Sequence, residues 1–235
     1  MYKRSIKLYD DDIGKVEYVA HMGDDRTIVN SARVSFGQEV ETMSRKDEKL
    51  INYLIKHKHT STLEHCSVTF RLKVPLFIRS QHHRHRTWSY NEISRRYTNF
   101  NLEFYEIKLF RKQSESNRQA SVDELVDPKV IYIDLPSGAS STASQLVKLH
   151  HESGLKLFKA LLKSGVCREQ ARGVLPQNLY TEYYATANLN NILKFIALRK
   201  HEGAQWEIQQ VAIAMTEILN DLYPITVKCW KNKEF

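Results

Sequence analysis

The sequence has no apolar run of about 18 residues, the length that a membrane-spanning helix needs, so we expect no membrane span. Residues 1–5 are not followed by an apolar segment, so a secretory signal is not expected either. Cysteine is scarce. Cys66, Cys167 and Cys229 lie far apart and lack the spacing of a disulfide framework or a paired zinc site. We therefore expect free thiols and a cytoplasmic protein.

Hydrophobic residues make up 42% of the 235 residues and charged residues 26%, which is ordinary for a globular protein. The net charge of +8 indicates an anionic partner. That partner could be nucleic acid, an anionic surface or a small phosphorylated ligand. Total charge does not separate these classes, so the positions of the arginines are more informative than their number.

Hydrophobic periodicity predicts both strands and helices. Residues 68–74 alternate as in a half-buried strand, and the aromatic, threonine-rich residues 180–187 predict a second, buried strand. Polar residues 111–145 predict a long surface excursion with a short strand at 130–133. Helices are predicted to begin at Ser44, near Thr142, at Arg168, at Asn188 and near Ile208. We expect one α+β domain over residues 1–235, with a small, mostly antiparallel sheet flanked by helices.

Residues 81–97 are dense in groups that bind ligands. They hold four arginines and three histidines, with Glu92 as the one carboxylate. So many cations in a short stretch repel one another, so an anionic ligand is the natural explanation. The planar fork of arginine suits phosphate or carboxylate. Ser89, Asn91 and Ser94 add neutral hydrogen bonds, and Glu92 can orient an arginine or accept from a base or sugar.

Other interpretations of this segment compete. His82, His83 and His85 could bind a metal, but consecutive histidines rarely point one way and no carboxylate or thiolate lies at ligand spacing. No metal is therefore expected. A solvated basic face or a nucleic-acid patch remains open, because aromatic residues interleave with the arginines. A nucleotide-binding module without turnover is a further alternative.

The spacing of the motif resembles that of the flavin-dependent thymidylate synthases. Their signature is Arg-His-Arg, seven residues and then Ser, and here Arg84-His85-Arg86 is followed at that spacing by Ser94. Ser89, Asn91, Glu92, Arg96 and Tyr97 fit the longer form of the pattern. Residues 58–65, 99–105, 168–176 and 198–208 resemble other blocks of the family, so the likeness runs from about residue 30 to about residue 225.

This resemblance implies reductive methylation of dUMP to dTMP. The one-carbon donor would be 5,10-methylenetetrahydrofolate, FAD the hydride carrier and NADPH the reductant. None of the three cysteines lies in the motif of the ordinary thymidylate synthases, which use a cysteine nucleophile. The resemblance also implies a homotetramer with shared active sites and no membrane or nucleic-acid partner.

Roles carry over from the family residue by residue. Arg199 is the catalytic candidate, because a fixed guanidinium at the uracil edge would stabilise negative charge as N3 loses its proton. His59 resembles a residue of the folate and NADPH cleft. For dUMP the resemblance implies Gln81, His82, His83, Arg84, Glu92, Ser94, Arg95, Arg96, Arg172 and Arg199. For FAD it implies Ser61, Glu64, Arg84, His85, Arg86, Glu92, Asn188, Asn190 and Lys194.

Some positions depart from the family pattern. Ser80 precedes Gln81 where an arginine is usual, and Arg79 lies one residue earlier. Asn190 stands where another arginine is frequent and Lys194 where an asparagine is common. Gly203 replaces a frequent histidine. These changes leave the reaction class intact and bear on the individual FAD and folate contacts.

Overall fold

The computed structural model describes residues 4–117, 120–131 and 140–232. They form two compact units. The first comprises the described residues of Met1–Lys73, His82–Asn91 and Tyr183–Phe235, and the second those of Val74–Gln81 and Glu92–Glu182. The chain passes between the units four times, so the units interleave in sequence. That both serve one functional domain stays a prediction.

A five-stranded sheet belongs mostly to the first unit. Its order is β1 (Ser5–Lys7), β2 (Lys15–Met22), β3 (Ser67–Pro75), β9 (Tyr180–Asn188) and β4 (Ser89–Glu92). The β1–β2 and β2–β3 pairs are antiparallel. The period-two pattern of β3 buries Val68, Phe70 and Leu72 completely. The strands predicted at 68–74 and 180–187 and the small antiparallel sheet are therefore confirmed.

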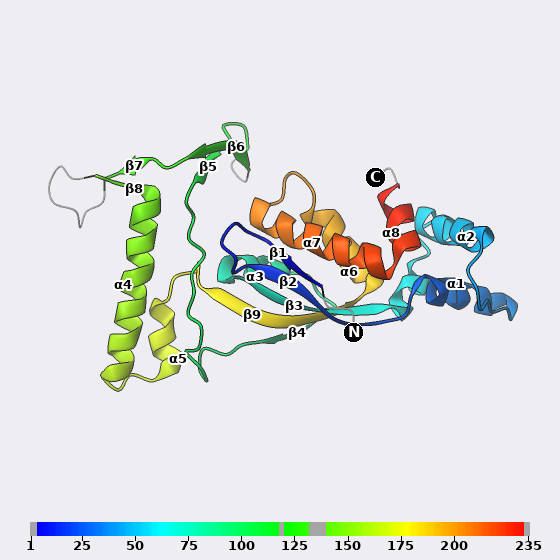
Figure 1. Cartoon of the computed structure of the whole chain (residues 1–235), viewed down its shortest axis with the longest axis horizontal. Coiled ribbons are helices and arrows are strands. Elements are labelled where there is room, and N and C mark those ends of the chain that lie inside the picture. The colour runs from blue at the N-terminus through cyan, green and yellow to red at the C-terminus, as the bar shows by residue number, and fades with distance from the viewer. Residues whose placement is uncertain (1–3, 118–119, 132–139, 233–235) are drawn as a thin grey trace. The chain divides into compact units, whose positions relative to one another are not determined.

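The first unit also contains helices, one of which packs on strand β2 of this sheet. These helices are α1 (Asp25–Arg33), α2 (Arg45–Lys56), α6 (Leu189–Arg199), α7 (Trp206–Leu222) and α8 (Pro224–Lys231), with 3-10 helices η1 (Val34–Phe36) and η2 (Thr60–His65). Helix α7 packs against β2, α6 and α8 (Figure 1). Apolar residues at helical spacing on α6 and α7 are fully buried, among them Ile192, Ile196, Ile208, Val211 and Met215.

The helix starts follow the capping chemistry of the sequence. Ser44 and Asp47 form a reciprocal capping box on α2. The Asn188 side chain accepts from the backbone N–H of Asn191 at 2.9 Å. Both predicted caps are confirmed. Helix α8 was not predicted, because its 8 residues are too short for a clear periodic signal.

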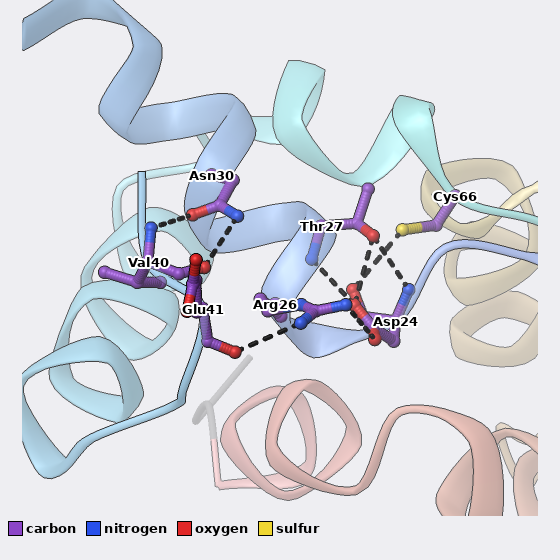
Figure 2. A network of polar contacts seen from close by, with 7 residues as sticks. All are labelled: Asp24, Arg26, Thr27, Asn30, Val40, Glu41 and Cys66. Atoms are coloured by element: carbon purple, nitrogen blue, oxygen red, sulfur yellow. Dashed lines mark hydrogen bonds and ion pairs between the residues drawn. The ribbon is translucent and has the colours of Figure 1, made fainter. Parts of the chain in front are cut away.

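Side chains of α1 hold the loop that leads to α2 (Figure 2). The Asn30 amide donates to the carbonyl of Val40 at 3.0 Å and accepts from the Val40 N–H at 2.9 Å. It thus pairs with the Val40 backbone in the way that a neighbouring strand does. Arg26 donates to the carbonyl of Glu41 at 3.0 Å. Asp24 caps the helix by accepting from the Thr27 N–H at 2.8 Å. The loop is thus tied to α1 by specific polar contacts.

The second unit contains most of α3 (Leu76–His82), together with α4 (Ala143–Lys163), α5 (Arg168–Ala171) and the 3-10 helix η3 (Arg172–Val174). Helix α4 begins after its cap Thr142, which agrees with the helix start predicted near that residue. Among the described residues, no helix has the length and apolar character needed to cross a bilayer.

The surface excursion predicted for residues 111–145 contains more strand than expected. Strands β5 (Phe110–Gln113) and β6 (Ser121–Val126) form an antiparallel pair, as do β7 (Lys129–Val130) and β8 (Ser141–Thr142). Strand β6 is almost wholly exposed, so it has no buried face to produce an alternating pattern. Of the strand expected at 130–133, Tyr132 and Ile133 lie outside the described residues.

Asp25 offers a test of how the first unit is held together. Its buried carboxylate accepts from the Ile225 N–H at 2.8 Å, the Thr226 N–H at 3.0 Å and the Thr226 hydroxyl at 2.5 Å, and so caps α8 from another helix. We expect Asp25→Ala to lower the free energy of unfolding by about 2–3 kcal/mol, because buried donors lose a charged acceptor. Chemical denaturation measures this. Asp10→Ala, at an exposed turn, is the control, and an equal effect of both variants would refute the capping role.

Candidate functional site

The histidines of the motif form an aromatic cluster in the first unit. His82 is completely buried, and its Nδ1 lies 2.8 Å from the Tyr183 hydroxyl. The rings of Phe195, Trp88 and Tyr90 lie around it, with centroids 4.7, 4.8 and 5.3 Å from its own. Burial, with smaller contributions from His85, His83 and Arg199, lowers the pKa of His82 well below its usual value. His82 is thus a neutral core residue, and this packing gives the predicted dUMP contact no support.

The same packing occupies Trp88 and Tyr90, two of the three aromatic residues that suggested a nucleic-acid patch, whereas the third, Tyr97, is 79% exposed. Trp88 and Tyr90 stack with an interplanar angle of 7°, and His83 lies 4.1 Å from Tyr90 between ring centroids. The Tyr90 hydroxyl donates to the carbonyls of His82 and His85 at 3.0 and 3.2 Å. These rings therefore shape the turn between α3 and β4.

Arg84 and Arg86 lie in this turn and are exposed. Neither guanidinium forms a hydrogen bond or ion pair with another residue in the part of the chain that the structure describes. Thr87, which follows them, has a left-handed backbone conformation with φ of 63°. The two forks are therefore available to an anionic ligand.

Arg199, the last residue of α6, is held by His85. The Arg199 Nε–H donates to His85 Nε2 at 3.0 Å. Because arginine can only donate, His85 Nε2 is an acceptor and the imidazole proton is on Nδ1. Burial, assisted by Arg199, lowers the pKa of His85 to about 4. Burial and then the charge of Arg84 lower the pKa of Arg199.

The residues predicted to bind FAD lie in the first unit, except Glu92. The Asn190 amide donates to Glu64 Oε1 at 2.8 Å, so α6 and η2 bring these two residues together. Asn188 is the cap of α6, Ser61 and Glu64 are exposed on η2, and Lys194 is exposed on α6. His59 precedes η2, and its ring stacks with Tyr53 at 5.9 Å between centroids. The exposed cations, amides and hydroxyl groups of this unit are donors of the kind that a dinucleotide with a diphosphate requires.

The second unit contains a cleft of about 490 Å³, a size typical of small-molecule sites. Four residues predicted to bind dUMP line it: Glu92, Ser94, Arg95 and Arg172. The other lining residues are Leu76, Arg79, Ile93, Gly173, Leu175, Leu179 and Thr181. Gln81 lies on α3 in the same unit and is half-buried.

Two of the predicted arginines are bonded to protein groups. Arg95 donates to the carbonyls of Phe100 at 2.5 Å and of Asn101 and Tyr180 at 3.2 Å each. Burial lowers its pKa, partly opposed by nearby glutamates. Arg96 pairs with Glu169 at 3.2 Å. Both residues therefore support the loop after β4, and their contacts with dUMP stay predictions.

Arg172 is exposed and donates only its Nε–H, to the carbonyl of Glu169 at 3.4 Å. Its terminal N–H groups have no partner among the described residues and remain available to a ligand. Arg79 was absent from the predicted set, yet it lines the cleft, and its Nε lies 3.3 Å from Glu92 Oε1. The one sign of Arg79 in the sequence is that it lies one residue before the position where the family usually has an arginine.

Another cavity, of about 460 Å³, lies in the first unit beside the contacts drawn in Figure 2. Arg26, Thr27, Asn30, Ser31, Glu39, Val40, Glu41 and His65 line it, and none of them belongs to the predicted site. No sequence motif marked it. Within the described ranges, no group of three or more His, Cys, Asp or Glu side chains is arranged to hold a metal ion.

Comparison with known proteins places these residues in a family. Residues 17–225 match the family described as thymidylate synthase complementing protein. A flavin-dependent thymidylate synthase from Thermus thermophilus is 44% identical over 214 residues, covering 91% of this chain and 74% of that protein. One from Thermosipho africanus is 38% identical over 219 residues, covering 93% and 91%.

Solved structures agree with the sequence comparison. The UMP/dUMP methylase PolB from Streptomyces cacaoi bound with 5-Br dUMP has a TM-score of 0.78 at 30% identity, and covers 96% of this chain and 97% of its own. Its structure with 5-Br UMP has a TM-score of 0.76, also at 30% identity, with 96% of each chain covered. The chain therefore belongs to the thymidylate synthase complementing protein family, that of the flavin-dependent thymidylate synthases.

Proposed function

We propose that this chain methylates dUMP to dTMP, with 5,10-methylenetetrahydrofolate as one-carbon donor, FAD as hydride carrier and NADPH as reductant. The observation that carries the proposal is the set of free terminal guanidinium N–H groups on Arg84, Arg86 and Arg172 within the matched motifs. The named functions of the relatives and the 5-bromo nucleotides bound to PolB support it.

The cleft of the second unit has the groups that a nucleoside monophosphate needs. Arg172 offers terminal N–H groups to a phosphate. The Ser94 Oγ accepts from the Arg96 N–H at 3.3 Å, so its own proton can be donated to a ligand. Glu92 can accept from a sugar hydroxyl or a base N–H. We assign Glu92, Ser94 and Arg172 to the nucleotide, with Arg95 and Arg96 holding the loop that presents Ser94.

The exposed donor set of the first unit would hold FAD, which supplies a hydride when bound. Arg84 and Arg86 neutralise its diphosphate, and Lys194 adds a further cation. The remaining contacts come from Ser61, Glu64, Asn188 and Asn190. We place His59 in the folate and NADPH cleft.

Arg199 is assigned the catalytic role. A guanidinium at the uracil edge stabilises the negative charge that develops as N3 loses its proton, which makes C5 more nucleophilic. The neutral His85 ring fixes the Arg199 Nε–H and leaves its terminal N–H groups for the substrate. Such stabilisation depends on a rigid donor, because a mobile one must be ordered in each turnover.

A homotetramer, a cytoplasmic location and the absence of a nucleic-acid partner are further parts of the proposal. Val34 and Phe36 on η1 are 70% and 81% exposed. Large apolar side chains left in water are a common feature of surfaces that associate, which supports self-assembly.

Arg199→Ala should lower kcat about 10²–10³-fold while the fold is retained, because a donor to the developing charge is lost. Release of tritium from C5-labelled dUMP, with the folate donor and NADPH, measures the reaction. Lys200→Ala, at the next and exposed position, is the control and should keep full activity. Wild-type turnover by the Arg199 variant would exclude the catalytic role, and a wild-type chain without turnover would exclude the proposed function.

Arg86→Ala should purify with less flavin, because one of the free cationic forks for the diphosphate is removed. The visible absorption of the purified protein reports bound flavin, and circular dichroism reports the fold. Arg45→Ala removes another exposed arginine of the first unit and should keep the flavin. Equal flavin content in the wild-type protein, the Arg86→Ala variant and the Arg45→Ala variant would contradict the assignment of Arg86 to FAD.

His85 should remain neutral down to about pH 4, because burial raises the cost of its protonated form. Its folded pKa lies below the ordinary value of 6.5, so the unfolded chain takes up the proton first as the pH falls. Stability should therefore decrease between about pH 6.5 and pH 4. An NMR titration of the imidazole, assigned with His85→Gln, checks this, and a midpoint near 6.5 would contradict the buried acceptor.

A further inference from the structure

The Glu92 carboxylate is bonded on one side only. The Thr181 hydroxyl donates to Glu92 Oε1 at 2.6 Å, and Arg79 forms an ion pair with the same oxygen at 3.3 Å from Nε, without a hydrogen bond from that atom. Among the described residues, no hydrogen bond or ion pair is formed with Oε2. The carboxylate therefore has one oxygen held by protein groups and one open to the cleft.

We propose that Arg79, together with Thr181, positions Glu92 so that its free oxygen binds the nucleotide. The inference rests on the proposed function, since it takes the cleft as the nucleotide site. Arg79 is a positioning residue here, because it acts on the ligand through Glu92.

The elements that carry the three residues are tied to one another within the second unit. Leu76, at the start of α3, donates its N–H to the carbonyl of Leu179 at 3.0 Å, and Phe77 donates to Gln177 at 3.3 Å. Ile93, next to Glu92, donates to the carbonyl of Glu182 at 2.9 Å. Thr181 lies between these two attachment points, so the backbone fixes the distances between the three side chains.

The charges in the cleft explain why the Glu92 carboxylate has to be held in place. Arg95 and Arg172 line the same cleft, and an unrestrained carboxylate could rotate toward either of them. The side chains of Arg79 and Glu92 are 30% and 25% exposed, so their attraction is less screened than that of a surface pair. Thr181 is buried and adds a short, directional hydrogen bond. The two contacts together keep Oε1 engaged and Oε2 available.

Arg79→Ala should raise the Kd and KM for dUMP about tenfold and change kcat less than about threefold, because a charge-assisted contact that orders Glu92 is lost. Arg79→Lys should recover part of the affinity, since it keeps the charge without the fork. Thr181→Val should also raise the Kd and KM for dUMP, because it removes the other group that holds Glu92. Isothermal titration of the FAD-loaded chain gives Kd, tritium release gives KM and kcat, and thermal unfolding reports the fold.

Two further variants separate positioning from direct contact. Ser80→Ala is the matched control, because Ser80 is exposed on the same helix and its hydroxyl bonds only to the carbonyl of Leu76 at 2.9 Å. In a Glu92→Gln background, Arg79→Ala should add less than about twofold to Kd, since the carboxylate it positions is gone. If Arg79→Ala did not fold, Arg79→Lys and Thr181→Val would decide the question.

The outcomes are distinct. Unchanged dUMP binding in folded Arg79 and Thr181 variants overturns the inference and leaves the proposed function standing. A tenfold loss that persists in the Glu92→Gln background also overturns it, because Arg79 would then touch the nucleotide itself. A wild-type chain that neither binds dUMP nor releases tritium overturns the proposed function, and the inference with it.

Discussion

Repulsion between like charges is the constraint that shapes the motif region. Within each unit the protein limits it by keeping neighbouring groups neutral or by bonding individual guanidiniums to protein acceptors. His82 and His85 are held uncharged by burial, so the first unit adds no imidazolium charge at these two positions beside Arg84 and Arg199. In the second unit, Arg95 is bonded to backbone carbonyls and Arg96 to Glu169. A few guanidiniums of the motif region therefore keep donors that are free to bind a ligand.

This division explains how one motif can serve both structure and chemistry. A guanidinium bonded to protein acceptors fixes a loop, whereas one with free terminal donors can hold an anion. Arg199 is an intermediate case, because the neutral His85 ring accepts from one of its donors and leaves the others free. Glu92 is a similar case with a negative charge. Thr181 holds one of its carboxylate oxygens, and the other is open. Half-engaged groups of this kind are rigid and still able to bind, which a catalytic site requires.

Local chemistry was enough to predict much of the fold. The alternation of β3, the aromatic run of β9 and the caps at Ser44, Thr142 and Asn188 each depend on residues close in sequence. The β5–β6 pair could not be predicted, because an exposed strand buries no alternate face. The cap of α8 could not be predicted either, since Asp25 reaches it across 200 residues of sequence. Pairing at such separation depends on the tertiary fold.

The candidate site shows the same limit at the level of single residues. The motif spacing identified which residues carry the chemistry, but spacing does not say which donors are already used. Arg95 and Arg172 look equivalent in the sequence, yet the first donates to three carbonyls and the second keeps its terminal groups free. Trp88 and Tyr90 look like a stacking platform for bases, yet they pack around His82. A cationic and aromatic motif therefore acquires its function from the burial and bonding of each side chain, so its composition alone cannot distinguish a nucleotide site from a nucleic-acid surface.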